Sequence, residues 1–278
     1  MQGHDLRLAN FIWQQRAPEA ARTMGNLVDA CKSLGADRAL EAIEMLKSEF
    51  VDRIFHHPLT VKFMRASPAL QRCVRLLVDA CDFLGADVGD DMANFMAAAS
   101  CSPSQIFLHR LFPLNSDLEL HSLGEHNVCI AKVATSFNQV GLSVWTAGFC
   151  LIEACLGGML PLSGKVVCEV GAGVGLTAVA LSKAAASCPH VRPSRLIVTD
   201  YCAQVLQNMD STLIANGIDF TSQWQEHPPQ APPPHAFIVS DLLDVRDTRA
   251  CAEFAVLHQV RMQLFHDHAV LSTVFLLV

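Results

Sequence analysis

The amino-acid sequence predicts an α/β fold: a doubly wound, Rossmann-like sheet of parallel strands preceded by an α-helical region. Three observations support this prediction. Apolar residues recur at helical spacing through about the first hundred residues. The segment 164–177, GKVVCEVGAGVGLT, has the pattern of a strand, a tight glycine turn and the start of a helix. After it, strand-like and helix-like segments alternate, which is typical of a parallel sheet covered on both faces.

The composition is that of a globular protein whose partners are small molecules or proteins. The chain has 278 residues, of which 51% are hydrophobic and 17% charged, and its net charge is −7. The sequence shows no basic patch, which argues against nucleic acid as a partner. Its apolar stretches are too short to cross a membrane and no secretory signal is recognisable, so we expect a cytoplasmic protein with no membrane partner.

The cysteine and histidine residues show no metal-binding pattern. The eleven cysteines are scattered without a C-x-x-C pair, and the twelve histidines lack companions at zinc-like spacing. We therefore expect reduced thiols and no metal site.

The residues 1–115 are predicted to form the α-helical region. Serine, proline and asparagine in the segment 100–116 mark its boundary with a second domain, 116–278. Apolar positions with a helical period define three helices, over 20–34, 37–54 and 68–84.

An internal repeat lies within this helical region. Residues 27–37, LVDACKSLGAD, recur as residues 77–87, LVDACDFLGAD, with nine of eleven positions identical. Because a helical array needs about three units to bury a continuous face, two copies favour a local duplication inside a small bundle.

The second domain is predicted to begin with a hairpin and to continue into the main sheet. Residues 118–120 and 128–133 alternate as the strands of an antiparallel hairpin do, and a helix ending near Leu156 precedes the glycine turn. Helices are expected directly after the glycine turn, over 203–216 and over 252–264. The strands of the main sheet are expected at 166–170, 195–199, 218–224, 236–240 and 269–278.

The glycine turn is predicted to hold a nucleotide-like ligand. Glycines at alternate positions, Gly171, Gly173 and Gly175, permit positive φ angles and a close approach of a ligand to the main chain. A dinucleotide fingerprint requires a sixth-position glycine, where this chain has Leu176. The carboxylate of Glu169 suits a ligand with an ammonium and a sulfonium group, and S-adenosylmethionine has both. The alternative is that the glycines only permit tight packing of the strand against the helix.

Asp200 ends the second predicted strand. A carboxylate at this position is placed to accept hydrogen bonds from both hydroxyls of a ribose. The alternative is a helix N-cap for the segment 203–216.

These residues, with the motif IVSDLL at 238–243, resemble those of the seven-β-strand, class I protein-lysine methyltransferases of methyltransferase family 16. The resemblance is strongest to the elongation factor 2 lysine methyltransferase subfamily, which also has a helical N-terminal region. It implies a methyltransferase sheet, S-adenosylmethionine as the cofactor and a protein substrate, elongation factor 2 within that subfamily.

The resemblance also implies a role for individual residues. Asp241 opens the motif that faces the substrate and would orient the lysine amine. The glycine turn would hold the methionine end of the cofactor, Asp200 the ribose, and Trp224 and the backbone of Ser240 the adenine. The implied cofactor-binding residues are Trp145, Glu169, Gly171, Ala172, Gly173, Asp200, Trp224 and Ser240.

The chain departs from the family pattern in three places. Gln223 replaces the aspartate that precedes the tryptophan, and Asp244 stands where an aromatic residue is expected. The sequence also stops inside or just after the fifth predicted strand, which predicts a C-terminally incomplete sheet. These departures favour an alternative function, a catalytically degenerate methyltransferase-like binding module that acts through its helical N-terminal half. A nicotinamide oxidoreductase is the third hypothesis.

Overall fold

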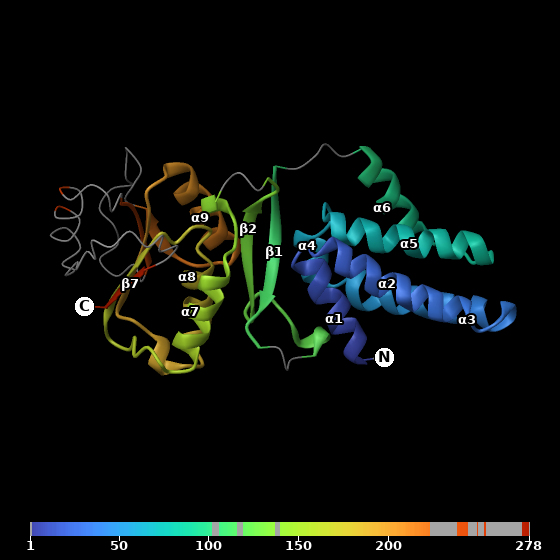
Figure 1. Ribbon diagram of the computed structural model, residues 1–278, viewed down its shortest axis with the longest axis horizontal. Coiled ribbons are helices and arrows are strands. Elements are labelled where there is room, and N and C mark those ends of the chain that lie inside the picture. The colour runs from blue at the N-terminus through green and yellow to red at the C-terminus, as the bar shows by residue number, and fades with distance from the viewer. Residues whose placement is uncertain are drawn as a thin grey trace. The chain divides into compact units, whose positions relative to one another are not determined.

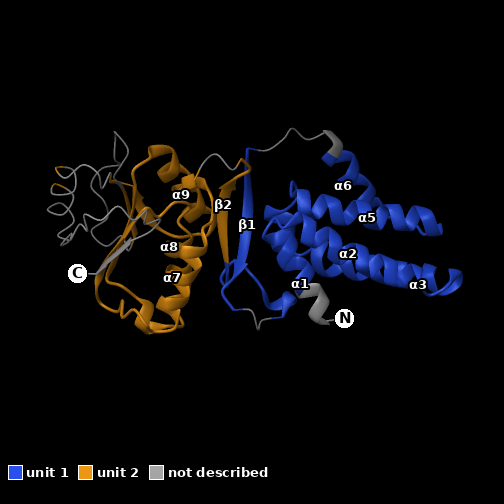
Figure 2. Cartoon of the chain, viewed as in Figure 1, with its two compact units in different colours: residues 1–128 blue, residues 129–278 orange. Residues whose placement is uncertain are grey.

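The chain forms two compact units, residues 1–128 and residues 129–278 (Figure 2), so the division falls later than the boundary expected at Asn115. The computed structural model describes residues 2–101, 106–115, 119–136, 140–222, 238–243, 249, 253 and 274–277.

The first unit is mainly α-helical, as Figure 1 shows. The three predicted helices are present as α2, α3 and α5, and the π-helix η1 takes up the end of the segment predicted as a single helix over 37–54. The sequence pattern did not predict α1, α4 and α6. The helices are α1 (Gln2–Trp13), α2 (Ala17–Lys32), α3 (Ala36–Phe50), η1 (Val51–Phe55), α4 (Pro58–Phe63), α5 (Pro68–Leu84) and α6 (Asp90–Cys101).

Local signals in the sequence fix the ends of α5. The Ser67 hydroxyl accepts the backbone N–H of Leu70 at 3.2 Å, Pro68 occupies the first turn, and Gly85 closes the helix in the left-handed conformation at φ 72°. Helices α2 and α5 pack against each other, and each ends in one copy of the internal repeat. The repeat is therefore part of one small bundle.

Three hydrogen bonds hold the short helix α4 within the first unit. The indole Nε1 of Trp13 donates to the Thr60 hydroxyl at 3.0 Å, and both groups are buried. His57 accepts the N–H of Leu59 on Nδ1 at 3.2 Å, which leaves Nε2–H to donate to the Leu120 carbonyl at 3.1 Å. Burial lowers the pKa of His57, although its bond to Leu120 opposes that shift.

The hairpin expected from 118–120 and 128–133 is wrong at Leu120, and residue 118 lies outside the described residues. Strand β2 (Val128–Ala134) is present, but Leu120 begins the 3-10 helix η2 (Leu120–Ser122), and the strand that precedes β2 is β1 (Phe107–Pro113). Alternating apolar residues over only three positions fit a 3-10 turn as well as a strand, because one buried side chain, here Leu120, satisfies either pattern.

The second unit contains a mixed sheet with helices packed on it. The strands are β3 (Val166–Val170), β4 (Arg195–Asp200), β5 (Phe220–Ser222), β6 (Ile238–Leu242) and β7 (Val274–Leu277), in the order β5-β6-β4-β3-β7. The first four are mutually parallel, as expected. The helices are α7 (Thr146–Leu156), α8 (Leu176–Ala184) and α9 (Ala203–Ala215), with 3-10 helices η3 (Val140–Leu142) and η4 (Pro189–Val191).

The expectation of an entirely parallel sheet is wrong for the last strand. β7 is antiparallel to β3, with Glu169 opposite Phe275 and Val170 opposite Val274. Alternation of side chains has a period of two in either direction, so a short apolar run carries no information about strand direction. The helix predicted over 252–264 lies almost entirely outside the described residues.

Candidate functional site

The candidate site lies at the carboxyl ends of β3, β4 and β6. In the sheet register Glu169 stands beside Val198, which stands beside Ser240, and Thr199 stands beside Asp241. Because successive side chains of a strand point to opposite faces, Glu169, Asp200 and Ser240 share one face. Asp241 points to the other face. The structure therefore brings two of the three predicted acidic residues to the same side of the sheet.

Glu169 is a fully enclosed carboxylate with one unsatisfied oxygen. Its side chain is 1% exposed, and among the described residues its Oε2 has no hydrogen-bond partner. The hydroxyl of Thr177, on the first turn of α8, donates to the carboxylate and favours its charged form. Burial outweighs that bond and raises the pKa of Glu169 to about 8, so the group is largely neutral at pH 7.

The charge of Glu169 acts on two buried thiols. Burial, helped by the nearby Glu169, raises the pKa of Cys155 on α7 to about 11 and that of Cys168 on β3 to about 12. These thiols are neutral at ordinary pH, so they do not act as nucleophiles.

The glycine turn connects β3 to α8. Gly171, Gly173 and Gly175 all have positive φ angles, of 73°, 56° and 77°. The N–H of Ala172 donates to the Thr199 carbonyl at 2.8 Å, which ties the turn to the end of β4. The turn is thus an ordered strand-to-helix connection of the kind predicted.

Two of these glycines also have a packing role. A Cβ atom on Gly175 would stand 2.6 Å from Cγ of Met209 on α9, and one on Gly173 would stand 3.2 Å from the Gly141 carbonyl oxygen. The alternative reading of tight packing therefore holds for Gly175 in particular. It does not account for the unsatisfied oxygen of Glu169 next to the turn.

Asp200 is buried and accepts a backbone N–H on each of its oxygens. Its Oδ2 accepts the N–H of Gly173 at 3.3 Å and its Oδ1 accepts the N–H of Cys202 at 3.2 Å. Burial raises its pKa, and these backbone hydrogen bonds oppose the shift. The N-cap residue of α9 is Cys202, so Asp200 is not the helix cap that sequence reasoning offered as the alternative.

Of the other predicted site residues, Trp145 is exposed, and the Ser240 hydroxyl is bonded to another side chain. Trp145 is 49% exposed, stands at the N-cap of α7, and donates from its indole Nε1 to the Val140 carbonyl at 2.9 Å. The Ser240 hydroxyl donates to Asp210 on α9 at 2.9 Å, and Ser222 donates to the same carboxylate at 3.1 Å. Trp224, with Gln223 and Asp244, lies outside the described residues.

Sequence reasoning missed two polar residues of this region. Thr177 was visible as a hydroxyl within the apolar start of α8, directly after the glycine turn, and could have been found by that contrast. Asp210 had no such signal, because an aspartate in the middle of a helix normally faces solvent. In this fold it is buried and accepts hydrogen bonds from β5 and β6.

The residues present fit S-adenosylmethionine in two respects. When Glu169 is ionised, its Oε2 is a buried acceptor without a partner among the described residues, and S-adenosylmethionine has a positively charged sulfur and an ammonium group. The main chain at Gly171, which has no side chain, permits a close approach. No group of three or more His, Cys, Asp and Glu side chains suited to a metal ion is found in the part of the chain that the structure describes.

Comparison with known proteins identifies distant relatives, although no family model matches the chain. The chain is 22% identical over 183 residues to bovine protein-lysine N-methyltransferase EEF2KMT, a match that covers 65% of this chain and 50% of the relative. It is 24% identical over 216 residues to the human protein of the same name, covering 78% of this chain and 60% of the relative. The matches thus span little more than half the length of these relatives. The chain is thus similar, at low identity, to two proteins named protein-lysine N-methyltransferase.

Both relatives carry the name of a protein-lysine N-methyltransferase. The described residues include no helix that is long and apolar enough to cross a membrane.

Proposed function

We propose that this protein is an S-adenosylmethionine-dependent protein-lysine N-methyltransferase with the Rossmann-like sheet of the class I, family 16 enzymes. The observation that carries the proposal is the unsatisfied, enclosed oxygen of Glu169 beside the glycine turn. The two distant relatives, which bear the name protein-lysine N-methyltransferase EEF2KMT, support the same reaction class. Elongation factor 2 is the proposed protein substrate and the cytoplasm the proposed compartment.

When bound, S-adenosylmethionine supplies an electrophilic methyl group and positive charge. In this proposal Glu169 ionises and faces that charge, and the turn at Gly171, Ala172 and Gly173 lies against the methionine end. Asp200 holds the turn in place through Gly173 N–H and keeps lone pairs for the ribose hydroxyls. Trp145, Trp224 and the Ser240 backbone complete the cofactor site.

The protein's contribution to the transfer is positioning and removal of water. The lysine amine must be neutral to attack a methyl group, and Asp241, 8% exposed at the end of β6, is proposed to orient that amine by accepting an N–H hydrogen bond.

Calorimetric titration with S-adenosylmethionine tests cofactor binding. The wild type is expected to bind. The Gly173→Arg variant is expected not to bind, because its side chain would fill the turn, where even a Cβ atom is 3.2 Å from the Gly141 carbonyl. Gly164→Arg is the matched control: Gly164 has a φ of 72° and open space around it, so this variant has comparable backbone strain with the turn left free. Absence of binding by the wild type would overturn the proposal.

Transfer of a radiolabelled methyl group to purified elongation factor 2 tests the reaction. The expected product is methyllysine in the wild type and none with Gly173→Arg. The orientation of Asp241, on the face opposite Glu169, favours the alternative of a degenerate binding module. Cofactor binding without any transfer would support that alternative.

A further inference from the structure

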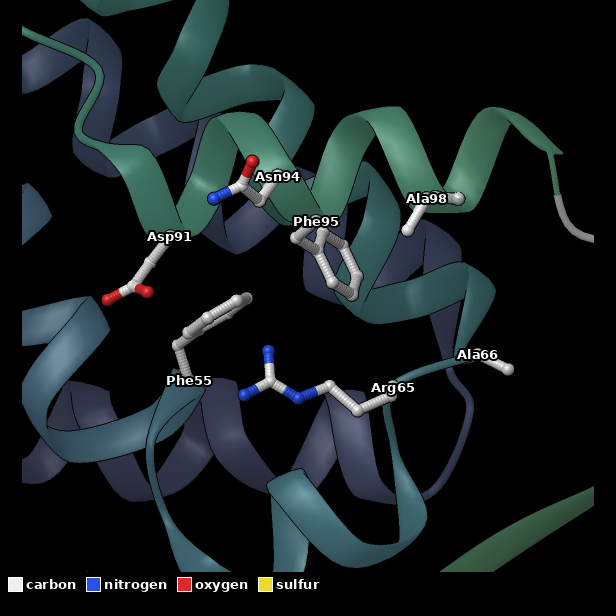
Figure 3. A pocket seen from close by; sticks show the side chains of 8 residues that line it. Phe55, Arg65, Ala66, Asp91, Asn94, Phe95 and Ala98 are labelled. Atoms are coloured by element: carbon white, nitrogen blue, oxygen red, sulfur yellow. The ribbon is translucent and has the colours of Figure 1, made fainter.

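A pocket lies in the helical unit, in residues to which neither the sequence motifs nor the proposed reaction assigns a role. Its volume is about 400 Å³, within the range of sites that hold small ligands or side chains. It is formed by η1, the turn between α4 and α5, and α6 (Figure 3). The lining residues are Phe55, Arg65, Ala66, Asp91, Asn94, Phe95, Ala98 and Ala99.

Two aromatic rings form the inner wall. Phe55 and Phe95 are buried, and their rings meet edge to face with centroids 5.3 Å apart at 84°. The alanines at positions 66, 98 and 99 keep the rest of the wall small and apolar. A flat or branched apolar group fits these surroundings.

Arg65 supplies the one positive charge of the lining. Its guanidinium lies over the Phe55 ring, 4.3 Å from the centroid, and extends into the pocket in Figure 3. No described side chain forms an ion pair or a hydrogen bond with it. A guanidinium has its N–H groups in one plane, the arrangement that binds a carboxylate with two hydrogen bonds.

Asp91, on α6 at the edge of the pocket, lies 3.1 Å from Nε2 of His56. Within the part of the chain that the structure describes, it forms no ion pair with Arg65. Asn94, also on α6, offers an amide that donates or accepts. The charge and shape of the pocket therefore complement a carboxylate attached close to an apolar group.

We propose that this pocket binds a protein partner through a short segment in which an aromatic residue is followed by an acidic one. The polar lining residues Arg65, Asp91 and Asn94 are exposed, so the site is open on one side and leaves room for the flanking chain of a peptide. The ring occupies the space against Phe95, and the carboxylate meets Arg65. This inference goes beyond the proposed methyl transfer and does not depend on it.

The test uses the full chain and ¹⁹F NMR of capped tetrapeptides, Gly-(4-fluoro-Phe)-Asp-Gly and its Asn and Lys counterparts. We expect the Asp peptide to bind about tenfold more tightly than the Asn peptide, and the Lys peptide most weakly. Arg65→Gln is expected to abolish the preference for Asp over Asn. Arg72→Gln, which changes another exposed arginine of this unit outside the pocket, is the matched control and keeps the preference.

A second variant probes the shape of the site. Ala98→Leu fills the pocket from the α6 side without changing its charge, and we expect all three peptides to bind at least about tenfold more weakly. Free 4-fluorophenylacetate is the small-molecule arm, and we expect it to bind more weakly than the Asp peptide. Equal binding of the Asp and Asn peptides, a preference unchanged by Arg65→Gln, no binding up to about 10 mM, or tighter binding of the free acid would each overturn the proposal.

Discussion

The ends of β3 and β4 each carry a buried carboxylate on the same face of the sheet, but the two are satisfied differently. Asp200 uses both oxygens to accept backbone N–H groups, from Gly173 and Cys202. Glu169 has a hydroxyl donor for one oxygen and none among the described residues for the other. Asp200 therefore stabilises the turn in the folded chain by itself, whereas Glu169 is a costly group that a cationic ligand would satisfy.

Asp200 and Glu169 differ because backbone N–H donors reach only the first of these two carboxylates. The loop after β4 turns its own N–H toward Asp200, and the glycine turn adds a second one. Glu169 receives a hydroxyl hydrogen bond from Thr177 on α8, and no described group donates to its Oε2. Changes to the turn, to Asp200 and to Glu169 should accordingly have separable effects.

The largest effect is expected from changing the turn that joins the two strand ends. Gly175→Ala introduces a side chain at φ 77° and only 2.6 Å from Cγ of Met209, so left-handed strain and overpacking add. We expect a loss of about 3 kcal/mol in the free energy of unfolding, measured by urea denaturation. Gly217→Ala, at φ 65° with open space around it, is the control and should lose about 1 kcal/mol. Equal losses would show that packing on Met209 plays no part.

Removing the satisfied carboxylate should destabilise the protein. Asp200→Ala leaves the N–H groups of Gly173 and Cys202 without their acceptor, and we expect a loss of about 2 kcal/mol in the same measurement at pH 7. Asp219→Ala, at an exposed position of the same unit, should change stability by less than about 0.5 kcal/mol. A neutral Asp200→Ala variant would contradict the role of Asp200 in holding the turn.

Removing the charge of Glu169 should stabilise the protein, whereas removing Asp200 should destabilise it. The pKa of Glu169 is raised to about 8 in the folded chain from an ordinary value of 4.5, so the unfolded chain binds fewer protons between these values. Stability from this group is fully present below about pH 4.5 and is lost as the pH rises through about 8. Glu169→Gln should match the wild type near pH 4.5 and exceed its free energy of unfolding by at least about 1 kcal/mol at pH 8 or above.

Glu153→Gln is the control for that measurement, because Glu153 is an exposed acid on α7. It should leave the pH dependence of unfolding unchanged. A Glu169→Gln variant that is less stable than the wild type at pH 8 would show that Glu169 is satisfied in the folded chain.

The smallest effect concerns the ligand and depends on the proposed function. If a cation binds beside Glu169, the group must lose its proton, so affinity for S-adenosylmethionine should rise as the pH increases toward about 8, by at most about tenfold per pH unit. Calorimetry in two buffers of different ionisation enthalpy should detect proton release in the wild type and none in Glu169→Gln. Binding with no proton release would separate Glu169 from the ligand while leaving cofactor binding itself intact.

The sequence alone determined the local features of this protein. The strand, glycine turn and helix around Gly171 are encoded by neighbouring residues, and so are the ends of α5, because Ser67, Pro68 and Gly85 act within one turn of the helix. The expectation that Asp200 and Glu169 both lie at a sheet edge followed from their positions at strand ends. Such features depend on contacts between residues that are close in the chain, so they can be recognised in the amino-acid sequence.

The internal repeat marks the limit of that reasoning. Ala30 and Ala80 occupy the same position of nearly identical sequences, yet Ala30 is exposed and Ala80 is buried. The sequence of the repeat is sufficient to form a helix, whereas burial depends on which neighbour each helix meets.

Only the tertiary structure decided the remaining features of the site. The antiparallel direction of β7, the position of Asp241 on the face opposite Glu169, and the bonds from Ser222 and Ser240 to Asp210 all join segments far apart in the chain. The same holds for the unsatisfied oxygen of Glu169, since it results from what α7 and α8 place around the carboxylate. A side chain's own sequence neighbours set its position on a strand, but the dielectric surroundings and donors that set its charge come from elements that meet it only after folding.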